Sequence, residues 1–249
     1  NQAQAMLKDV IENNRFDARA VFGLYPAQRT GADTVSVFDE TAQKVTHTFE
    51  HLRQQSDKVT GKPNLSLADF ISTSKDNTDY LGGFTVSIFG AEELANEYKA
   101  KGDDYSAILI QSLADRFAEA FAEHLHERIR KEFWGYKADE TLGNEELIKE
   151  KYVGIRPAPG YPACPEHSEK AVLFDWLGSE EKIGTKLTEH FAMMPPSSVS
   201  GFYYSHPESE YFNVGKISQD QLEDYAKRKG WTLDVAKRWL APNLDDSIG

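Results

Sequence analysis

The most regular pattern of apolar positions lies in the middle of the chain, between Asp104 and Phe133. Apolar residues recur there every three or four positions, which places them on one face of an α-helix. These residues are Ile110, Leu113, Phe117, Phe121, Leu125 and Ile129. Small side chains crowd the same stretch, at Ala114, Ala118, Ala120 and Ala122. We therefore expect one long helix that forms the spine of a single domain, with neighbouring backbone close to its alanines.

Shorter runs rich in β-branched and aromatic residues predict strands elsewhere in the chain. Five of them precede the long helix, at 18–25, 33–38, 44–49, 65–72 and 80–89. Two more follow it, at 198–205 and 210–217. The last two flank the polar sequence Ser205-His206-Pro207-Glu208, so we expect them to form a hairpin with a four- or five-residue loop.

The remaining helices are predicted from periodicity and from their end signals, at 2–14, 144–151, 218–229 and 232–240. Strands and helices do not alternate regularly along the chain. A doubly wound parallel sheet is therefore disfavoured, because that architecture requires such alternation. The pattern predicts an α+β domain with a largely antiparallel sheet.

Composition excludes several classes of partner. The 249 residues include 28 Lys and Arg against 40 Asp and Glu, a net charge of −12, which is unlike a nucleic-acid-binding surface or a membrane-docking one. No apolar run approaches the roughly 20 residues that span a bilayer. The single cysteine, Cys164, fits a reducing compartment, so we expect a cytoplasmic protein with neither nucleic acid nor membrane as partner.

The least ordinary stretch is the loop 156–165, which contains four prolines in ten residues. Proline fixes φ and removes backbone donors, so the loop should be a stiff track of exposed carbonyls. Gly160 would let its backbone approach a ligand, and the Arg156 guanidinium could hold a carboxylate or phosphate. Composition alone leaves a second interpretation open, in which the loop is only a polyproline connector between packed elements.

Other motifs point to no chemistry of their own. Cys164 and His167 are three residues apart, but the sequence has no second cysteine and no His-Glu-x-x-His, so we expect no metal site. It also contains no Gly-x-Ser-x-Gly and no glycine-rich phosphate loop, and we assign no catalytic residue.

Acidic and aromatic side chains each allow two interpretations. Asp115, Glu119 and Glu123 are spaced four apart on the predicted long helix, away from its apolar stripe. They form either a solvated helix face or a carboxylate surface toward a cationic ligand. Tyr211 and Phe212 belong either to the core of the predicted hairpin or to a ligand platform.

The stretch 156–170, RPAPGYPACPEHSEK, resembles the S-adenosylmethionine-binding signature of the activation domain of cobalamin-dependent methionine synthase. Nearly the whole chain resembles the same family. The similar segments include VFGLYPAQRTGADTV at 21–35, HLRQQ at 51–55, LADRFAEAFAEHLHERIRKEFWGY at 113–136, SHPESEYFNVGKISQDQLEDYAKRKG at 205–230 and RWLAPNL at 238–244.

The resemblance implies a single C-shaped α+β domain with a twisted, mainly antiparallel sheet and a long central helix. It also implies a reactivation module within a methyltransferase that makes methionine from homocysteine and methyltetrahydrofolate. Such a module presents S-adenosylmethionine for reductive methylation of inactive cob(II)alamin, which is bound by a neighbouring cobalamin domain. The electron comes from flavodoxin or a similar donor. The isolated chain would then not be catalytic.

Several residues take roles from this resemblance. It implies that Arg156 holds the carboxylate of S-adenosylmethionine and that backbone around Ala158 and Gly160 binds adenine and ribose. It places Tyr161 between the methyl donor and the cobalt face of cobalamin, where Tyr161 also meets the cobalamin domain.

The other roles that the resemblance implies belong to acidic and aromatic residues. Glu119 matches a carboxylate near the donor, where a negative charge suits its ammonium or sulfonium. Tyr211 and Phe212 match an aromatic pair near the ligand. Asp115 matches a residue that meets the docked cobalamin domain.

One family feature is expected to be missing. Members carry an Asp-Trp-x-Pro-Phe-Phe stretch upstream of the segment that matches Asn1, and its Asp helps to bind the donor's amino group. We therefore expect residues 1–249 to be an activation domain that lacks its N-terminal segment. Two other functions stay open, namely a free-standing S-adenosylmethionine-dependent methyltransferase of small molecules and a pure interaction domain for a redox protein.

Overall fold

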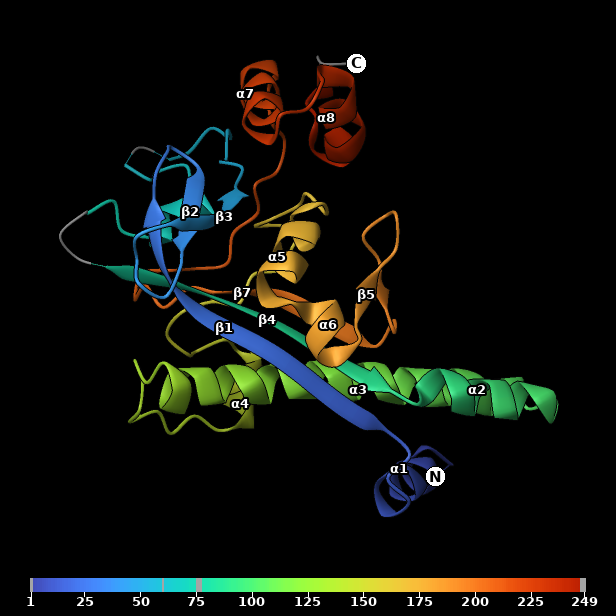
Figure 1. Ribbon diagram of the computed structural model, residues 1–249. Helices are drawn as coiled ribbons and strands as arrows, with labels where there is room; N and C mark the ends of the chain where they lie inside the picture. The colour runs from blue at the N-terminus through green and yellow to red at the C-terminus, as the bar shows by residue number, and fades with distance from the viewer. Residues whose placement is uncertain (1, 60, 75–77, 247–249) are drawn as a thin grey trace.

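A five-stranded antiparallel sheet forms the centre of the computed structural model, which describes residues 2–59, 61–74 and 78–246 (Figure 1). Its strand order is β3-β2-β1-β4-β7, and each neighbouring pair is antiparallel. The strands are β1 (Asp17–Arg29), β2 (Thr34–Phe38), β3 (Val45–Glu50), β4 (Asp79–Phe89) and β7 (Ser198–Tyr203). The predicted α+β class with a mainly antiparallel sheet is confirmed.

Helices make up a large part of the rest of the described chain. The α-helices are α1 (Gln2–Glu12), α2 (Ala91–Ala100), α3 (Asp104–Arg128), α4 (Asn144–Ile148), α5 (Glu169–Leu177), α6 (Ser179–Ile183), α7 (Gln219–Lys229) and α8 (Leu233–Leu240). Shorter elements are the 3-10 turns η1 (Leu67–Phe70) and η3 (Ala241–Asn243), the π-helical turn η2 (Ile129–Phe133) and the strands β5 (Lys186–Leu187) and β6 (Met193–Met194). In the described residues, no helix is both long and apolar enough to span a membrane.

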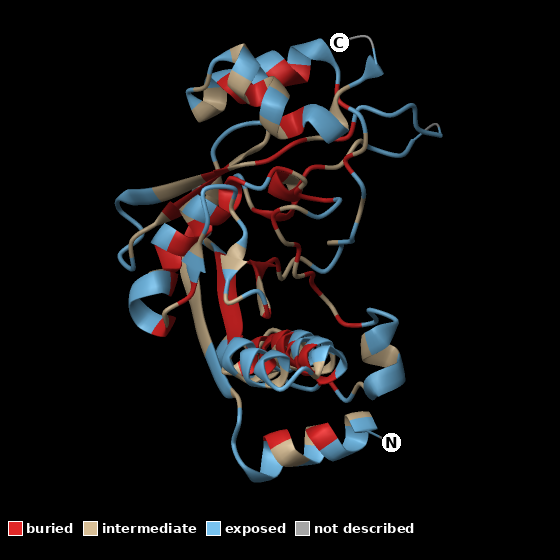
Figure 2. Ribbon diagram, turned by 90° about the vertical axis from the view of Figure 1, so that its right-hand side faces the viewer, coloured by how far each residue is buried: buried red, intermediate tan, exposed pale blue. Residues whose placement is uncertain are grey.

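Alternating side chains of the sheet pack against two helical layers. On β4, Phe84 and Val86 face α3, whereas a Cβ at Gly83, the residue before Phe84, would meet the ring of Trp176 on α5. On β7, Tyr203 packs on the α3 side and Phe202 on the α5 side. This period of two is what a strand buried on both faces requires. Figure 2 shows buried positions both on strands of the sheet and on the helices that pack against it.

Small side chains bring α3 close to the sheet. Ala114, Ala118 and Ala122 are completely or almost completely buried, whereas Phe117 and Phe121 of the predicted apolar stripe are only half-buried. The line of closest contact therefore follows the alanines. Ala120, which was grouped with them in the prediction, faces solvent.

Two predicted strands are wrong. The run 65–72 contributes only an isolated bridge between Ser66 and Arg53, followed by the turn η1. The run 210–217 forms no strand, so the predicted hairpin does not exist. The edge of β7 is instead occupied by the proline-rich loop, through an isolated bridge between Ile155 and Tyr204. The pattern of apolar residues does not predict that this loop pairs with β7, because a segment rich in proline does not have the sequence pattern of a strand.

Three helices were not predicted. They are α2, α5 and α6. The sequence of α5 is apolar on more than one side, because Leu173, Phe174, Trp176 and Leu177 are all buried between the sheet and other elements. Without an amphipathic stripe, a helix this short gives no clear period of 3.6.

Replacing Ala118 by Leu should lower the free energy of unfolding by about 1–3 kcal/mol, because a larger side chain has no space between α3 and the sheet. Ala120→Leu, two residues away on the exposed side, should change it by less than about 0.5 kcal/mol. Urea denaturation followed by circular dichroism measures both. Equal losses in the two variants would show that α3 is not held closely at its alanines.

Candidate functional site

A cavity of about 330 Å³ lies between α3, the proline-rich loop and the segment that follows β7. Its volume lies in the range of small-molecule sites. The residues that line it come from widely separated parts of the chain: Glu119, Glu150, Arg156, Pro157, Ala158, Tyr161, Pro162, Ala163, Val199, Tyr211 and Phe212. The structure thus brings together six of the sequence-predicted site residues, namely Arg156, Ala158, Tyr161, Glu119, Tyr211 and Phe212.

The first part of the loop is fixed by main-chain pairing with β7. The amide of Phe202 donates to the carbonyl of Pro157 at 2.8 Å, and Ile155 and Tyr204 exchange two amide–carbonyl hydrogen bonds of 3.0 Å. Gly201 makes this approach possible, because a Cβ there would lie 2.6 Å from the Pro157 carbonyl oxygen. The loop therefore behaves as an additional extended segment at the edge of the sheet.

Two turns follow, so the second part of the loop is not the extended track that composition predicts. The amide of Tyr161 donates to Ala158 at 3.1 Å and that of Cys164 to Tyr161 at 2.9 Å. Gly160, inside the first of these turns, has φ +95°, and a Cβ there would collide with the His167 ring. Gly160 is thus required by the packing of the loop and does not line the cavity. A contact of its backbone with a ligand stays a prediction.

Arg156 is held by three groups. Its Nη2 donates to the Glu123 carboxylate at 2.7 Å, and its Nη1 donates to His126 Nδ1 at 3.1 Å and to the Tyr152 hydroxyl at 3.4 Å. A guanidinium has five N–H donors. The hydrogen bonds of the described chain therefore leave the Nε donor and one Nη2 donor of Arg156 for a ligand.

His126 serves this arrangement as a neutral acceptor. It is buried on α3, where desolvation and the charges of Arg130 and Arg156 hold its pKa well below the usual range. Its ring stacks on Tyr203 with centroids 5.2 Å apart. Because Arg156 can only donate, Nδ1 must accept, which places the proton of the neutral ring on Nε2.

Tyrosine hydroxyls connect Arg156 to the aromatic wall of the cavity. The Tyr211 hydroxyl accepts from the Arg156 backbone amide at 3.0 Å and lies 2.9 Å from the Tyr152 hydroxyl. Burial raises the pKa of Tyr152, so its hydroxyl stays protonated. Beside Tyr211, Phe212 packs on both neighbouring core clusters and meets the ring of Phe70 at 6.4 Å. The aromatic pair is thus anchored although it belongs to no strand.

Acidic side chains line two separate cavities. Glu119 and Glu150 line the cavity of Arg156. Asp115, one turn earlier on α3, accepts from the Ser197 hydroxyl at 2.7 Å and lines a separate cavity of about 310 Å³ beside Glu92. Sequence analysis missed Glu150, for which no motif gives a signal, and the pairing of Glu123 with Arg156, which are 33 residues apart.

The second half of the signature stretch packs into the domain instead of the cavity. Glu169 on α5 is fully buried and pairs with Lys229 of α7. Glu166 accepts from the Ser168 amide at 2.6 Å and from the Tyr225 hydroxyl at 3.2 Å. These contacts attach the end of the loop to α7.

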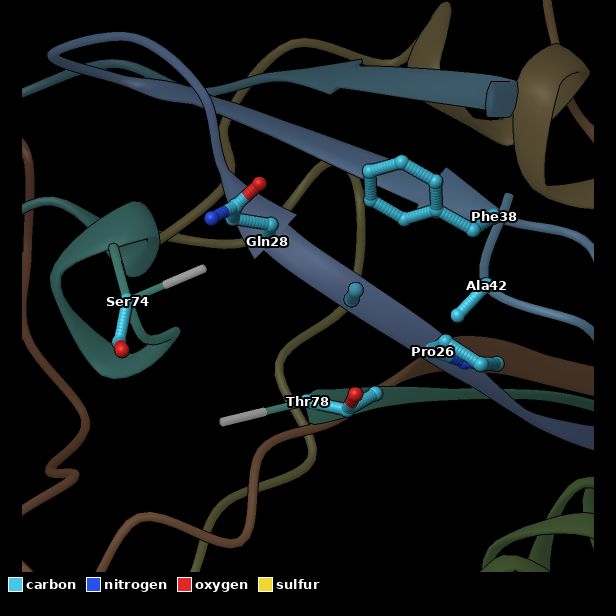
Figure 3. A pocket seen from close by; sticks show the side chains of 7 residues that line it. Pro26, Gln28, Phe38, Ala42, Ser74 and Thr78 are labelled. Carbon is cyan, nitrogen blue, oxygen red and sulfur yellow. The ribbon is translucent and has the colours of Figure 1, made fainter. Parts of the chain in front are cut away.

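A smaller cavity beside β1 and β2 is shown in Figure 3. Its volume is about 130 Å³, and its lining includes Pro26, Gln28, Phe38 and Ala42. None of its lining residues is ionisable, so it offers a charged ligand no partner. In the described part of the chain, no three His, Cys, Asp or Glu side chains are grouped to hold a metal ion.

Comparison with known proteins points to one family. Residues 1–230 match the family described as vitamin B12 dependent methionine synthase, activation domain. The chain is also similar to the crystal structure of the MetH reactivation domain bound to AdoHcy. The TM-score is 0.94 and the sequence identity 51%, over 98% of this chain and 75% of that one.

Replacing Glu169 by Gln should remove a pH dependence of stability. Burial raises the pKa of Glu169 to about 7 despite Lys229, so the folded chain keeps a proton that the unfolded chain loses near pH 4.5. The advantage of wild type over Glu169→Gln should therefore be largest below pH 4.5. It should fall by on the order of 3 kcal/mol as the pH rises through 7. Denaturant midpoints across this range measure it, and a pH-independent difference would refute it.

Proposed function

Because this chain belongs to the family of vitamin B12-dependent methionine synthase activation domains, we propose that the cavity at Arg156 binds S-adenosylmethionine for transfer of its methyl group to cobalamin. The supporting observation is the set of groups gathered in one cavity. The cavity contains a guanidinium with two remaining donors, two carboxylates and an aromatic wall. These groups match a ligand that carries a carboxylate, an ammonium, a sulfonium and an adenine. A 51% identical domain is bound to AdoHcy, which S-adenosylmethionine becomes on losing its methyl group.

Each group of the proposed ligand has a partner in the cavity. The remaining N–H donors of Arg156 suit the carboxylate, since guanidinium and carboxylate form charge-assisted pairs. Glu119 suits the ammonium or the sulfonium, and Glu150 adds a second negative charge. Tyr211 and Phe212 offer aromatic faces to adenine, and backbone near Ala158 and Gly160 would complete the adenosine site.

Two observations support a role for Tyr161 in contact with another molecule. It lines the cavity, yet 62% of its surface is exposed, an unusual position for a large aromatic side chain. We assign Tyr161 to the boundary between the methyl donor and the cobalamin that a neighbouring domain brings to the cavity. Asp115, exposed on α3 in a different cavity, is assigned to docking of that cobalamin domain.

In this function the chain binds and orients the methyl donor, and the cofactor supplies the reactivity. The methyl group leaves the sulfonium sulfur and AdoHcy remains. One electron for the reduction of cob(II)alamin comes from an external reductant such as flavodoxin, which we propose as a cytoplasmic partner. The isolated chain would then bind S-adenosylmethionine without turning it over.

Methyl transfer in trans tests this function. The chain is mixed with the cobalamin-binding domain loaded with cob(II)alamin, a chemical reductant and S-adenosylmethionine. Formation of methylcobalamin, seen in the absorption spectrum, should require both the chain and the methyl donor. Transfer to a small molecule without cobalamin would instead favour a free-standing methyltransferase.

Arg156→Ala should weaken S-adenosylmethionine binding by about 2–4 kcal/mol, because the ligand carboxylate loses a largely desolvated partner. Titration calorimetry measures the dissociation constant. Arg238→Ala on α8 removes an arginine outside the cavity and should leave the constant unchanged. An unaltered constant in Arg156→Ala would remove Arg156 from the ligand site.

Asp115→Ala should preserve S-adenosylmethionine affinity within about twofold, because Asp115 does not line that cavity. Methylcobalamin formation in the trans assay should nevertheless slow, since docking of the cobalamin domain is impaired. Loss of affinity in this variant would place Asp115 in the donor site instead.

A further inference from the structure

We propose that Glu123 is a positioning residue that holds Arg156 in the orientation required for the carboxylate of S-adenosylmethionine. The inference rests on the proposed function of the cavity. Glu123 does not line the cavity itself, so its effect on the ligand would pass through the guanidinium.

The contact between the two residues is charged and largely shielded from water. The Arg156 and Glu123 side chains are only 19% and 27% exposed, and Nη2 lies 2.7 Å from Oε2. The second carboxylate oxygen of Glu123, Oε1, is buried without a hydrogen-bond partner among the described residues. Arg156 is therefore the group that compensates the charge of Glu123, and the pair is stronger than one in water.

Glu123 is the only anion among the three groups that hold the guanidinium. The other two are the neutral His126 ring and the Tyr152 hydroxyl. Glu123 and His126 are three residues apart on α3, so they face Arg156 from the same side of one helix. Without Glu123, the long Arg156 side chain keeps only weaker, neutral partners.

The orientation matters because of which donors it leaves free. Both Nη1 donors are engaged by His126 and Tyr152, and one Nη2 donor is engaged by Glu123. The Nε donor and the second Nη2 donor together can form a two-bond pair with one carboxylate. If the guanidinium turned, the ligand would meet a different and less complete set of donors.

The test compares S-adenosylmethionine with decarboxylated S-adenosylmethionine, which keeps the adenosine, the sulfonium and the amine. Glu123→Ala should weaken the first ligand about tenfold and leave the second within about twofold, as measured by calorimetry. Glu123→Gln keeps an oxygen that can accept from Nη2 but loses the charge, so its loss of affinity should be smaller than that of Glu123→Ala without disappearing. Unchanged binding of the decarboxylated ligand also shows that the variant is folded.

A double-mutant cycle tests whether Glu123 acts through Arg156. In an Arg156→Ala background, Glu123→Ala should have no further effect on S-adenosylmethionine. A persisting tenfold loss, or equal weakening of both ligands by Glu123→Ala alone, would overturn the positioning role and leave the proposed function intact. Failure of the unaltered chain to bind S-adenosylmethionine would overturn the proposed function and this role with it.

Discussion

The pairing of residues 155–157 with the free edge of β7 is the contact on which the cavity depends. It is made by backbone groups, through the Phe202 amide on the Pro157 carbonyl and the exchange between Ile155 and Tyr204. It needs a glycine at 201, where any side chain would collide with the loop. Once the loop lies there, Arg156 faces α3 and Tyr161 reaches the cavity mouth. This pairing thereby covers the edge of the sheet and forms one wall of the cavity.

Charged side chains make different contacts in the two halves of the signature stretch, residues 156–170. In the first half, Arg156 pairs with Glu123 and keeps donors for a ligand. In the second half, Glu166 and Glu169 are buried against Lys229 and attach the loop to α7. Burying a carboxylate costs free energy unless a cation pairs with it. The Arg156–Glu123 pair and the contacts of Lys229 therefore compensate buried charge and also fix the positions of the side chains. One continuous stretch of sequence thus contributes both to the lining of the cavity and to the attachment of the loop to α7.

Local sequence predicted the strands β1 to β4 and β7 and the helix α3, because each has its own period and end signals. The prediction of a strand at 210–217 was wrong. The edge of the sheet next to β7 is occupied instead by a proline-rich segment more than fifty residues earlier in the chain. The resemblance predicted Arg156 and Tyr161 as site residues; both line the cavity, and their contact with a ligand stays a prediction. The Glu123 contact could not be predicted, since only the fold brings α3 to the loop.

The most direct measurement is a crystal structure of this chain grown with AdoHcy. The account predicts the ligand in the cavity lined by Glu119, Arg156 and Tyr211, with its carboxylate on the free donors of Arg156 and Glu123 still bound to the same guanidinium. A ligand in the separate cavity beside Asp115, or one whose carboxylate avoids Arg156, would contradict it.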